Sequence, residues 1–462
     1  MSVDTVSLTG WGRTAPTTAV RFRPRTYEEA AAVVRGRGPR GVIARGLGRA
    51  PGDAAQNAGG SVLDLTGLDR VRALDEGAGT VHCDAGVPLD RLLRVLLPRG
   101  LFLPVVPGTG RITVGGAIGS DVHGRDHPGA GSLARYVNAL DLLTADGEVR
   151  TVTPGTALFD ATTGGLGLTG VILGATLRLK RVASPLVSVS TERATDLDDL
   201  LARFTAGGGR GGDRHGAPMP YASAWVDLLA RGRATGRGVL TRGEHAPPSV
   251  LPAHAQRTMR APRTVRPDGR SAGTLLPGGL LGRTSAALFN ELRYRSAPRS
   301  RTGELRTTDA FFHPLDALAA LPEMNRLHGR AGLVRYRFTV GYGQEEALHR
   351  VVRRISARRC PAFRAELQRF GAPSPGWLSF PAPGWTLTLD LPAALPGLGR
   401  FLDGLDEEVA AAGGRICLAQ DSRTRPETAA AMYPRLAEFR ALRAELDPTG
   451  AFRSDLARRL GL

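Results

Sequence analysis

Three glycine-rich segments of the chain, 46–53, 107–118 and 164–170, have the residue types needed to bind a phosphate-containing cofactor. Small residues let the backbone N–H groups of a turn converge on a pyrophosphate without obstruction from side chains. A dinucleotide lying across the three turns is therefore physically sensible. The alternative is that they form ordinary tight turns, because 60 of the 462 residues are glycine. Any one of the turns, taken alone, favours that alternative.

Gly165, Gly167 and Gly170 have the spacing of a dinucleotide-binding fingerprint. In a Rossmann fold this fingerprint opens a helix whose N-terminus holds the pyrophosphate. Here it is followed by the sequence VILGATL (171–177), which is typical of a strand. We therefore reject the Rossmann interpretation. The chain also has neither a P-loop nor an HExxH motif, which excludes those phosphate and zinc sites.

Short strands and helices must position these turns in the first part of the chain. Thr26 is the expected N-cap of a helix, with Glu29 completing a capping box. A second helix begins at Pro88 and ends before 98–100. Its inward face is formed by Leu89, Leu92, Leu93 and Leu96. Strands are predicted at 19–22, 42–44, 62–65, 80–85, 138–144, 149–153 and 171–179.

The composition changes after about residue 183. Segments 205–220 and 244–285 are rich in Gly, Pro and Arg with little apolar periodicity, so we predict mobile loops there. Residues 221–227 are a candidate buried strand between them. Further strands are predicted at 333–341 and 385–391, with helices near 344–356, 400–411 and 426–446.

The composition is that of a globular protein, with 42% hydrophobic and 23% charged residues. No run of about 18 apolar residues is present, so we expect no membrane span. The first residues show no signal-peptide pattern. Three distant cysteines (Cys83, Cys360 and Cys417) argue against a disulfide scaffold and a thiolate metal site. These observations indicate a cytoplasmic protein without a structural metal.

The net charge of +18 invites a nucleic-acid function, but its composition argues against one. Lys180 is the only lysine among 61 basic residues, and this skew towards arginine is typical of a GC-rich genome. The arginines are scattered, and aromatic residues make up only 5% of the chain, too few for base stacking. A preference for anionic substrates, such as phosphates or acidic lipid head groups, remains reasonable.

Several motifs together resemble a known family. The segments RGLGR (45–49), PGT (107–109), TVGGAI (113–118) and DVHG (121–124) are similar to the FAD-binding, PCMH-type domain of the vanillyl-alcohol-oxidase superfamily. In particular, they resemble the flavoprotein subunits of decaprenylphosphoryl-β-D-ribose 2-epimerases. The likeness extends through most of the chain, at 10–14, 142–148, 223–225, 312–316, 378–385, 421–424 and 454–460.

The resemblance implies a two-domain α+β fold that holds FAD in an extended form. Residues 1–182 would form the FAD-binding domain and 183–425 the substrate-binding domain, with the mobile loops within it. The helical segment 426–462 would return to the FAD domain. Many superfamily members link the flavin to a histidine at the position of Arg49, so FAD is expected to be non-covalent here.

The resemblance also implies which residues contact the two ligands. The expected FAD contacts are Arg45, Gly46, Leu47, Gly48, Arg49, Gly52, Asp53, Asn57, Pro107, Gly108, Thr109, Thr113, Gly115, Gly116, Ala117, Ser120, His123, Gly124, Gly165, Gly167, Gly170, Ile172, Cys417 and Gln420. The expected substrate contacts are Trp225, Phe312, His313, Arg335, Arg337, Gln368, Trp385, Thr386, Thr388 and Asp390.

Oxidation of an alcohol needs a carbinol hydrogen aimed at flavin N5, a base for the hydroxyl proton, and positive charge near flavin N1. The expected catalytic residues are His123, Arg125 and Gln420. His123 follows the second glycine-rich turn and would take the proton with the help of a bound water; the alternative is a buried structural histidine. Arg125 stands where the family has a lysine, which keeps the charge and changes the geometry.

The pocket residues depart from the family pattern at several positions. Gln420 replaces the lysine that contacts the flavin pyrimidine edge, so Arg125, Arg337 or Arg423 would have to supply the charge. Thr388 replaces the cysteine attacked by covalent inhibitors, which closes that route. The other replacements are Phe312 for tyrosine, Arg335 and Arg337 for glutamines, Gln368 for lysine, and Thr386 for asparagine.

The expected function is FAD-dependent oxidation of a sugar hydroxyl, from 2′-hydroxyl to ketone, as the oxidative half of an epimerisation. The substrate would be a phosphorylated or polyprenyl-phosphate-linked furanose, a precursor of cell-wall arabinan. The expected partner is a nicotinamide-dependent short-chain reductase, with at most peripheral membrane contact and no nucleic acid. Two alternatives stay open: an oxygen-using oxidase of a free sugar, aldonolactone or secondary metabolite, and a flavin-binding protein that has lost catalysis.

Overall fold

The computed structural model describes residues 1–206, 220–250, 282–313, 325 and 328–462. Most of the two segments that we predicted to be mobile loops, 205–220 and 244–285, lies outside the described residues. At their described edges the prediction was wrong in part, since residues 244–245 end a strand and 283–285 begin a helix.

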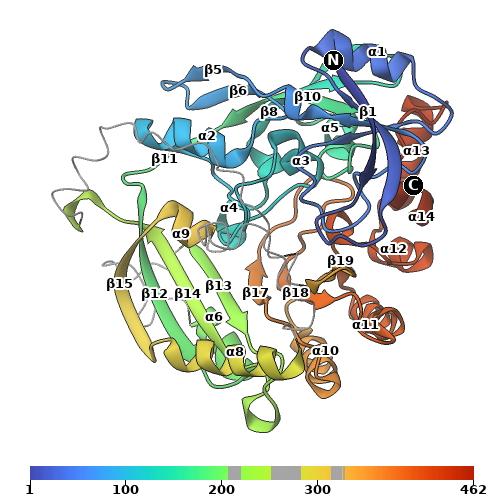
Figure 1. Cartoon of the computed structure of the whole chain (residues 1–462). Helices are drawn as coiled ribbons and strands as arrows, with labels where there is room; N and C mark the ends of the chain where they lie inside the picture. The colour runs from blue at the N-terminus through green and yellow to red at the C-terminus, as the bar shows by residue number, and fades with distance from the viewer. Residues whose placement is uncertain (207–219, 251–281, 314–324, 326–327) are drawn as a thin grey trace.

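The N-terminal part of the chain builds a four-stranded sheet in the order β1-β2-β4-β3 (Figure 1). Its strands are β1 (Ser2–Leu8), β2 (Thr17–Arg23), β3 (Val42–Arg45) and β4 (Ser61–Asp64). Helix α1 (Tyr27–Arg35) connects β2 to β3, both of which run parallel to β4. The Thr26 side chain accepts from the Glu29 N–H, but the Glu29 carboxylate accepts from the Arg25 N–H. The expected capping box is therefore only half formed.

A five-stranded antiparallel sheet in the order β5-β6-β10-β8-β9 follows. Its strands are β5 (Val71–Asp75), β6 (Thr80–Asp84), β8 (Val137–Leu143), β9 (Val149–Val152) and β10 (Val171–Arg178). Helix α2 (Leu89–Leu96) buries all four of its predicted inward leucines. The short strands β7 (Leu101–Phe102) and β11 (Lys180–Arg181) pair with each other. The strand predicted after Gly165–Gly170 is β10, which confirms that the fingerprint does not open a helix.

The later part of the chain forms one eight-stranded antiparallel sheet, in the order β15-β12-β14-β13-β17-β18-β16-β19. Its strands are β12 (Leu186–Ala194), β13 (Tyr221–Val226), β14 (Gly238–His245), β15 (Ser300–Thr307), β16 (Leu333–Val340), β17 (Ala365–Phe370), β18 (Gly384–Pro392) and β19 (Arg415–Ile416). The predicted strands near 221, 333 and 385 are confirmed. Strands β12, β14, β15, β17 and β19 were not predicted.

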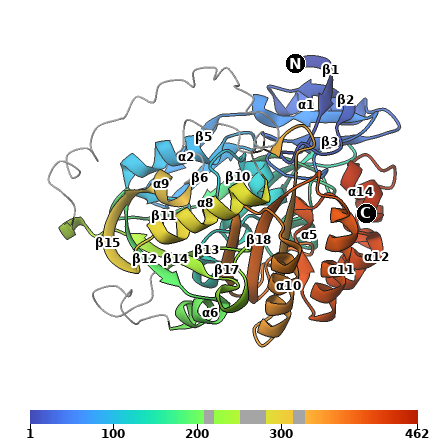
Figure 2. The ribbon, with the colours of Figure 1, turned by 60° about the horizontal axis from the view of Figure 1, so that its bottom comes forward.

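Helices cover the sheets and tie the C-terminus to the beginning of the chain (Figures 1 and 2). Those of the first part are α3 (Val114–Gly119), α4 (His127–Ala130) and α5 (Ala157–Thr162). The large sheet carries α6 (Leu197–Thr205), α8 (Arg283–Ser296), α9 (Thr308–Phe312), α10 (Glu345–Arg358) and α11 (Leu398–Ala411). The predicted helix at 426–446 is two helices, α12 (Pro426–Met432) and α13 (Leu436–Leu446), and α14 (Asp455–Leu460) ends the chain.

The C-terminal segment lies against the first sheet. The Val42 N–H donates to the Ala451 carbonyl at 2.7 Å, and the Asp455 N–H donates to the Gln56 carbonyl at 2.8 Å. The proposed domain boundaries at 182 and 425 stay a prediction.

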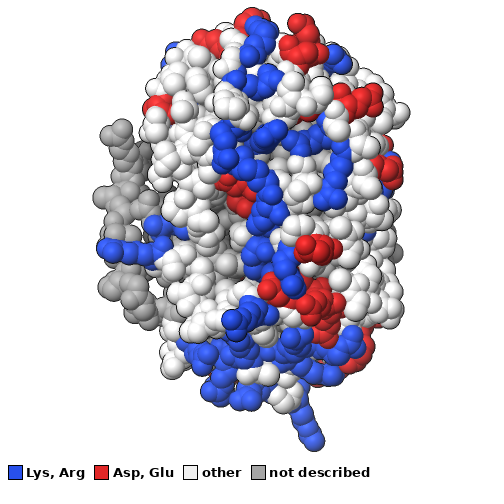
Figure 3. All heavy atoms as spheres, turned by 90° about the vertical axis from the view of Figure 1, so that its right-hand side faces the viewer, with Lys and Arg blue, Asp and Glu red and all other residues white. Residues whose placement is uncertain are grey.

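Charged side chains are mixed on the side of the molecule that carries the C-terminal helices. Figure 3 shows arginines there interspersed with acidic residues. Pairs such as Arg350–Glu408 and Arg425–Glu407 neutralise part of that charge. Within the described ranges, no helix is long and apolar enough to cross a membrane.

Candidate functional site

Two adjoining cavities lie where the glycine-rich turns meet the large sheet. The first encloses about 1340 Å³ of space open to solvent, between the turns and strands β16–β18. The second, of about 800 Å³, lies within the N-terminal part of the chain. Both are lined by Arg49, Ala50, Ile112 and Ser120, so they lie side by side. An elongated site of this size suits an extended dinucleotide with a substrate beside one end.

Close packing around the second cavity leaves no room for a Cβ atom at two of its glycines. A Cβ atom on Gly46 would lie 2.3 Å from the Thr113 Oγ1, and one on Gly115 would lie 2.8 Å from the Ala85 Cβ. Gly48 and Gly167 have φ angles of 64° and 76°, which also favour glycine. The glycines therefore form tight turns, and the cavity that these turns line is large enough for a dinucleotide. The two interpretations of the glycines are compatible. The site fits FAD.

Most of the expected FAD contacts line these cavities. In the second cavity they are Arg45, Gly46, Leu47, Gly48, Arg49, Thr113, Gly115, Gly116, Ser120, Gly167, Gly170 and Ile172. In the first they are Pro107, Gly108, Thr109, His123, Gly124, Cys417 and Gln420, together with Arg49 and Ser120.

Five expected FAD contacts lie outside the cavity linings: Gly52, Asp53, Asn57, Ala117 and Gly165. Ala117 is fully buried within α3. A Cβ atom on Gly52 would clash with the Asp421 carbonyl, and one on Gly165 with the Ala161 carbonyl. These residues shape the turns from behind.

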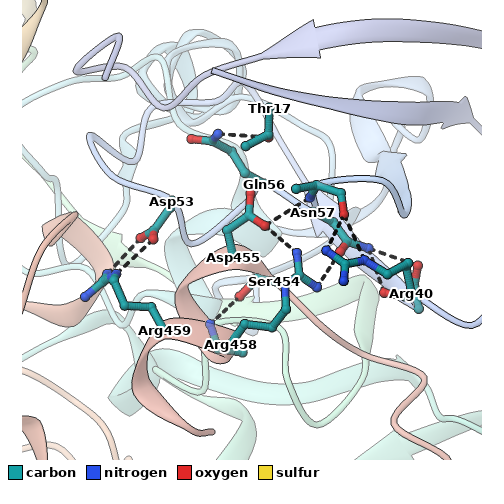
Figure 4. A network of polar contacts seen from close by, with 12 residues as sticks. Thr17, Arg40, Asp53, Gln56, Asn57, Ser454, Asp455, Arg458 and Arg459 are labelled. Atoms are coloured by element: carbon teal, nitrogen blue, oxygen red, sulfur yellow. Dashed lines mark hydrogen bonds and ion pairs between the residues drawn. The ribbon is translucent and has the colours of Figure 1, made fainter. Parts of the chain in front are cut away.

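Asp53 and Asn57 belong to a polar network that fastens the first glycine-rich turn to α14 (Figure 4). The Arg459 guanidinium donates to both Asp53 oxygens, at 2.9 and 3.0 Å. Arg458 donates to the Asn57 Oδ1 at 2.9 Å. The last helix of the chain thus holds the wall of the second cavity.

The first cavity contains half of the expected substrate contacts. Those that line it are Phe312, Arg335, Arg337, Gln368 and Thr388. Those that do not are Trp225, His313, Trp385, Thr386 and Asp390.

Packing elsewhere explains why these five lie outside the lining. Trp385 packs against Phe204 in the core, and its Nε1 donates to Glu345. Thr386 is fully buried. His313 lies behind the second turn, where a Cβ on Gly110 would come within 3.0 Å of its ring.

The other two residues, Trp225 and Asp390, contact neighbouring arginine side chains. Trp225 faces the Arg293 guanidinium, 4.8 Å from the ring centroid. Asp390 binds Arg335 through two hydrogen bonds of 2.6 and 2.8 Å. That ion pair fixes the side chain of a lining arginine from behind.

The first cavity is strongly cationic. Arg49, Arg125, Arg335, Arg337 and Arg364 line it, and Glu366 is the one carboxylate among the described residues that line it. Sequence reasoning missed Arg364 and Glu366. The available signal was the alternation of charged and apolar residues in AELQRF (365–370), which places Glu366 and Gln368 on one face of β17.

Several of these charges remain incompletely compensated. Burial lowers the pKa of Arg337 to about 10, which leaves it charged at neutral pH. Its Nη2 atom donates to the Gln368 Oε1 at 3.2 Å, a neutral partner. Arg125 donates to the Phe311 carbonyl at 2.8 Å and lies 3.7 Å from Glu366. The single carboxylate of Glu366 therefore faces several arginines, and the cavity favours an anionic ligand.

His123 presents one ring nitrogen without a partner. Its Nδ1 lies 3.4 Å from the Asp121 carbonyl oxygen, which can only accept, so Nδ1 carries the hydrogen. Its Nε2 is buried and has no hydrogen-bond partner among the described residues. Burial, and then the charge of Arg337, hold the pKa of His123 well below its ordinary value. The imidazole is thus neutral, and the Nε2 lone pair can accept a proton.

The positive charge missing at Gln420 can come from only some of the expected arginines. Arg423 binds Asp403 and Asp406 at 2.6 and 2.5 Å and does not line either cavity. Arg125 and Arg337 do line the first cavity. The Gln420 Oε1 is buried without a partner in the part of the chain that the structure describes, so it is open to a ligand donor.

Comparisons with known proteins identify the family. Residues 18–153 match a family model described as an FAD binding domain. A Streptomyces coelicolor protein, described as uncharacterised and from the mprA 5′ region, is 52% identical over 385 residues, covering 81% of this chain and 100% of its own length.

Two named enzymes match almost end to end. The decaprenylphosphoryl-β-D-ribose oxidase of Mycolicibacterium smegmatis is 40% identical over 99% of this chain and 98% of its own. The alditol oxidase of a Streptomyces species is 28% identical over 98% and 99%, respectively. Since the S. coelicolor protein is more similar than the decaprenylphosphoryl-ribose oxidase, the expected kinship to epimerase flavoproteins is established only at the level of the wider family. The chain belongs to the FAD-binding, PCMH-type oxidoreductases.

Proposed function

We propose that this protein oxidises a secondary hydroxyl of a phosphorylated or lipid-linked furanose, from the 2′-hydroxyl to the ketone. The observation that carries the proposal is the first cavity, which combines a surplus of arginines with a neutral imidazole whose Nε2 has no hydrogen-bond partner among the described residues. The 40% identity to a decaprenylphosphoryl-β-D-ribose oxidase over nearly the full chain supports the same substrate class.

The residues of the cavity divide the work. When bound, FAD supplies the acceptor for the hydride that leaves the carbinol carbon. The His123 Nε2 accepts the hydroxyl proton, directly or through one water. Arg125 and Arg337 bind the anionic group of the substrate and supply the positive charge that Gln420 cannot. Thr388 and Gln368 offer hydrogen bonds to the other sugar hydroxyls.

In this proposal FAD is bound without a covalent link, because arginine stands at residue 49. The Arg49 guanidinium lies 5.5 Å from the centroid of the Trp11 ring, at the junction of the two cavities. The proposed partner is a nicotinamide-dependent short-chain reductase that returns hydride to the opposite face of the ketone. Oxidation and reduction together would invert the carbinol centre, as needed for an arabinan precursor.

A second candidate is an oxidase of a free polyol that passes electrons to dioxygen. It is favoured by the 28% identity to an alditol oxidase across almost the whole of both chains. L-Gulonolactone oxidase of Mus musculus, which is 36% identical over 137 residues, adds the aldonolactones to the substrates worth testing. The cationic cavity does not favour these substrates, because free alditols and lactones are neutral.

The deciding experiment is an anaerobic titration of the holoprotein with ribose 5-phosphate, a polyprenylphosphoryl ribose and a free alditol. Loss of the oxidised flavin band near roughly 450 nm with a phosphorylated compound supports the proposal. Bleaching by the alditol alone, with rapid reoxidation in air, would identify the oxidase. A flavin that is reduced by dithionite but by none of the compounds would favour a protein without catalysis.

A further inference from the structure

Helix α8 turns its large apolar side chains to solvent, whereas a surface helix normally buries them. Its only fully buried side chains are Ala286 and Asn290. Leu288 and Leu292 are each 60% exposed, and Phe289 is 44% exposed. A helix on a protein surface normally turns its apolar stripe to the core and its polar side to water. The reversed arrangement leaves these three apolar side chains exposed on the described part of the molecule.

Polar contacts hold α8 in this orientation. The Asn290 side chain donates to Asp227 at 2.8 Å, and Glu291 pairs with Arg237 at 2.5 Å. The Arg237 guanidinium also lies over the Tyr294 ring, 4.4 Å from its centroid. Because Asn290, Glu291 and Tyr294 fix the inner face of the helix in this way, the outward direction of the leucines is built into the fold.

The exposed side chains form one continuous surface, which we call the apolar stripe: Leu288, Phe289 and Leu292. Leu288 and Leu292 lie one helical turn apart on the same face. The Phe289 ring packs against Phe363, with centroids 5.7 Å apart. Phe363 precedes Arg364, which lines the first cavity. In Figure 2, α8 lies across the strands of the large sheet, on the outside of the molecule.

Arginine predominates in the segment that carries the stripe, although Glu291 and, just beyond it, Glu304 pair with some of these arginines. Glu291 is the only acidic residue between 283 and 301, and it faces Arg237 on the inner side. Five arginines lie in the same interval: Arg283, Arg293, Arg295, Arg299 and Arg301. The Arg295 side chain is 76% exposed and, among the described residues, forms its ion pair with Glu291.

We infer that α8 is a membrane-contact helix, whose apolar stripe enters the head-group boundary of an anionic bilayer while the flanking arginines bind lipid phosphates. An apolar face bordered by arginines is the pattern of helices that lie in a lipid interface. The charge distribution disfavours a second copy as the occupant, because two stripes in contact would bring like-charged arginines together.

The experiment is flotation of the holoprotein with phosphatidylcholine vesicles, prepared with and without phosphatidylglycerol. We expect flotation with the phosphatidylglycerol vesicles only, weakening as salt is added. For the double variant L288S/L292S, the fraction of protein that floats should fall by about fivefold or more, because the variant loses the apolar area that would be buried in the bilayer. The matched control is V149S, which removes a 44% exposed valine from β9.

Two results would overturn the inference: a wild-type protein that does not float with anionic vesicles, or an L288S/L292S variant that floats as well as the wild type. A second variant, R283E/R295E, keeps the stripe and should lose the preference for phosphatidylglycerol. If light scattering instead shows that L288S/L292S converts a dimer to a monomer, the stripe binds a second copy. Flotation requires no turnover, so its outcome is separate from that of the flavin titration.

Discussion

The carboxylate of Asp121 accepts a hydrogen bond from the hydroxyl of Ser379, 258 residues further along the chain. It also accepts from the Ser132 hydroxyl at 2.7 Å and from the Ala134 N–H at 3.0 Å. The carbonyl of the same residue holds the Nδ1–H of His123. One buried acidic residue therefore joins the two halves of the chain and orients the proposed base.

Replacing Asp121 should destabilise the protein and disturb the base. Asp121→Ala leaves three buried donors without an acceptor, which should cost about 3 kcal/mol or more of the free energy of unfolding. Asp121→Asn keeps an acceptor oxygen and tolerates the φ of 40°, so it should cost much less. Urea unfolding of both variants checks this. Equal stability of Asp121→Ala and Asp121→Asn would show that the network is not structural.

His123→Gln tests the proposed base. The amide fills a similar volume but cannot take a proton, so the rate of flavin reduction by substrate should fall by about 100-fold or more. Anaerobic stopped-flow absorbance measures this rate directly. His82→Gln, on β6 of the five-stranded sheet, is the control and should reduce flavin like the wild type. An unchanged rate in His123→Gln would assign the histidine a structural role.

Flavin should leave the protein on denaturation. Arginine cannot form the bond to the flavin methyl group that a histidine forms, and Arg49 is at the position where that histidine is expected. After acid precipitation, all of the FAD absorbance should therefore appear in the supernatant. Flavin fluorescence that stays with the protein band on a denaturing gel would contradict non-covalent binding.

The sequence predicts best those elements whose buried apolar residues recur with a regular spacing. Helix α2 has leucines at i, i+3, i+4 and i+7, and all four are buried. The glycine-rich turns could be placed because close backbone packing leaves no other residue type, as at Gly46 and Gly115. Helix α8 could not be found, because its apolar residues point to solvent. Strand β15 (SRTGELRT) lies at a sheet edge and has almost no apolar residue to mark it.

The site was predicted less completely than the fold, for a physical reason. Core positions and cavity positions both attract aromatic residues, so Trp225 and Trp385 were expected to meet the substrate, whereas they pack against other side chains. Arg364 and Glu366 belong to no short motif. The alternation in 365–370 marks one face of β17, but whether that face meets the cavity depends on the register in which β17 pairs with β13 and β18, and this long-range pairing leaves no local pattern.

Arg459 should stabilise the FAD-binding turn from the last helix. Its guanidinium binds Asp53, Asp421 and the carbonyl of Thr424, all within 3.0 Å. Arg459→Met leaves the buried Asp421 carboxylate short of a partner and should lower the free energy of unfolding by about 2–3 kcal/mol. The variant should also release FAD more readily on dilution. Thermal unfolding with flavin fluorescence follows both effects.

The control for this variant is Arg435→Met, which breaks an exposed pair with Glu438. An exposed pair of this kind contributes about 0–1 kcal/mol, so the melting temperature should barely change. If Arg459→Met behaves in the same way as Arg435→Met, the network in Figure 4 does not support the cofactor site.

Arg337 should set both the affinity for anionic substrates and the pH range of the base. Burial is the main reason for the low pKa of His123, and the charge of Arg337 lowers it further. The base is active when neutral, so the rate of flavin reduction should be lost only as the pH falls through that lowered pKa, below 6.5. Arg337→Gln removes the repulsion on protonated His123. The pKa should then rise, and the acid limb of the rate profile should move to higher pH.

The same Arg337→Gln variant should bind a phosphorylated substrate more weakly and a neutral polyol unchanged, because only the former loses a charge-assisted hydrogen bond. Stopped-flow reduction measured across pH 5–8, roughly the range in which a histidine titrates, separates the two effects as changes in substrate affinity and in limiting rate. Arg335→Gln is unsuitable as a control because it leaves Asp390 unpaired, so Arg435→Met serves again. If the pH dependence of flavin reduction is identical to that of the wild type, the charge of Arg337 does not affect the pKa of His123. Burial alone would then keep His123 neutral.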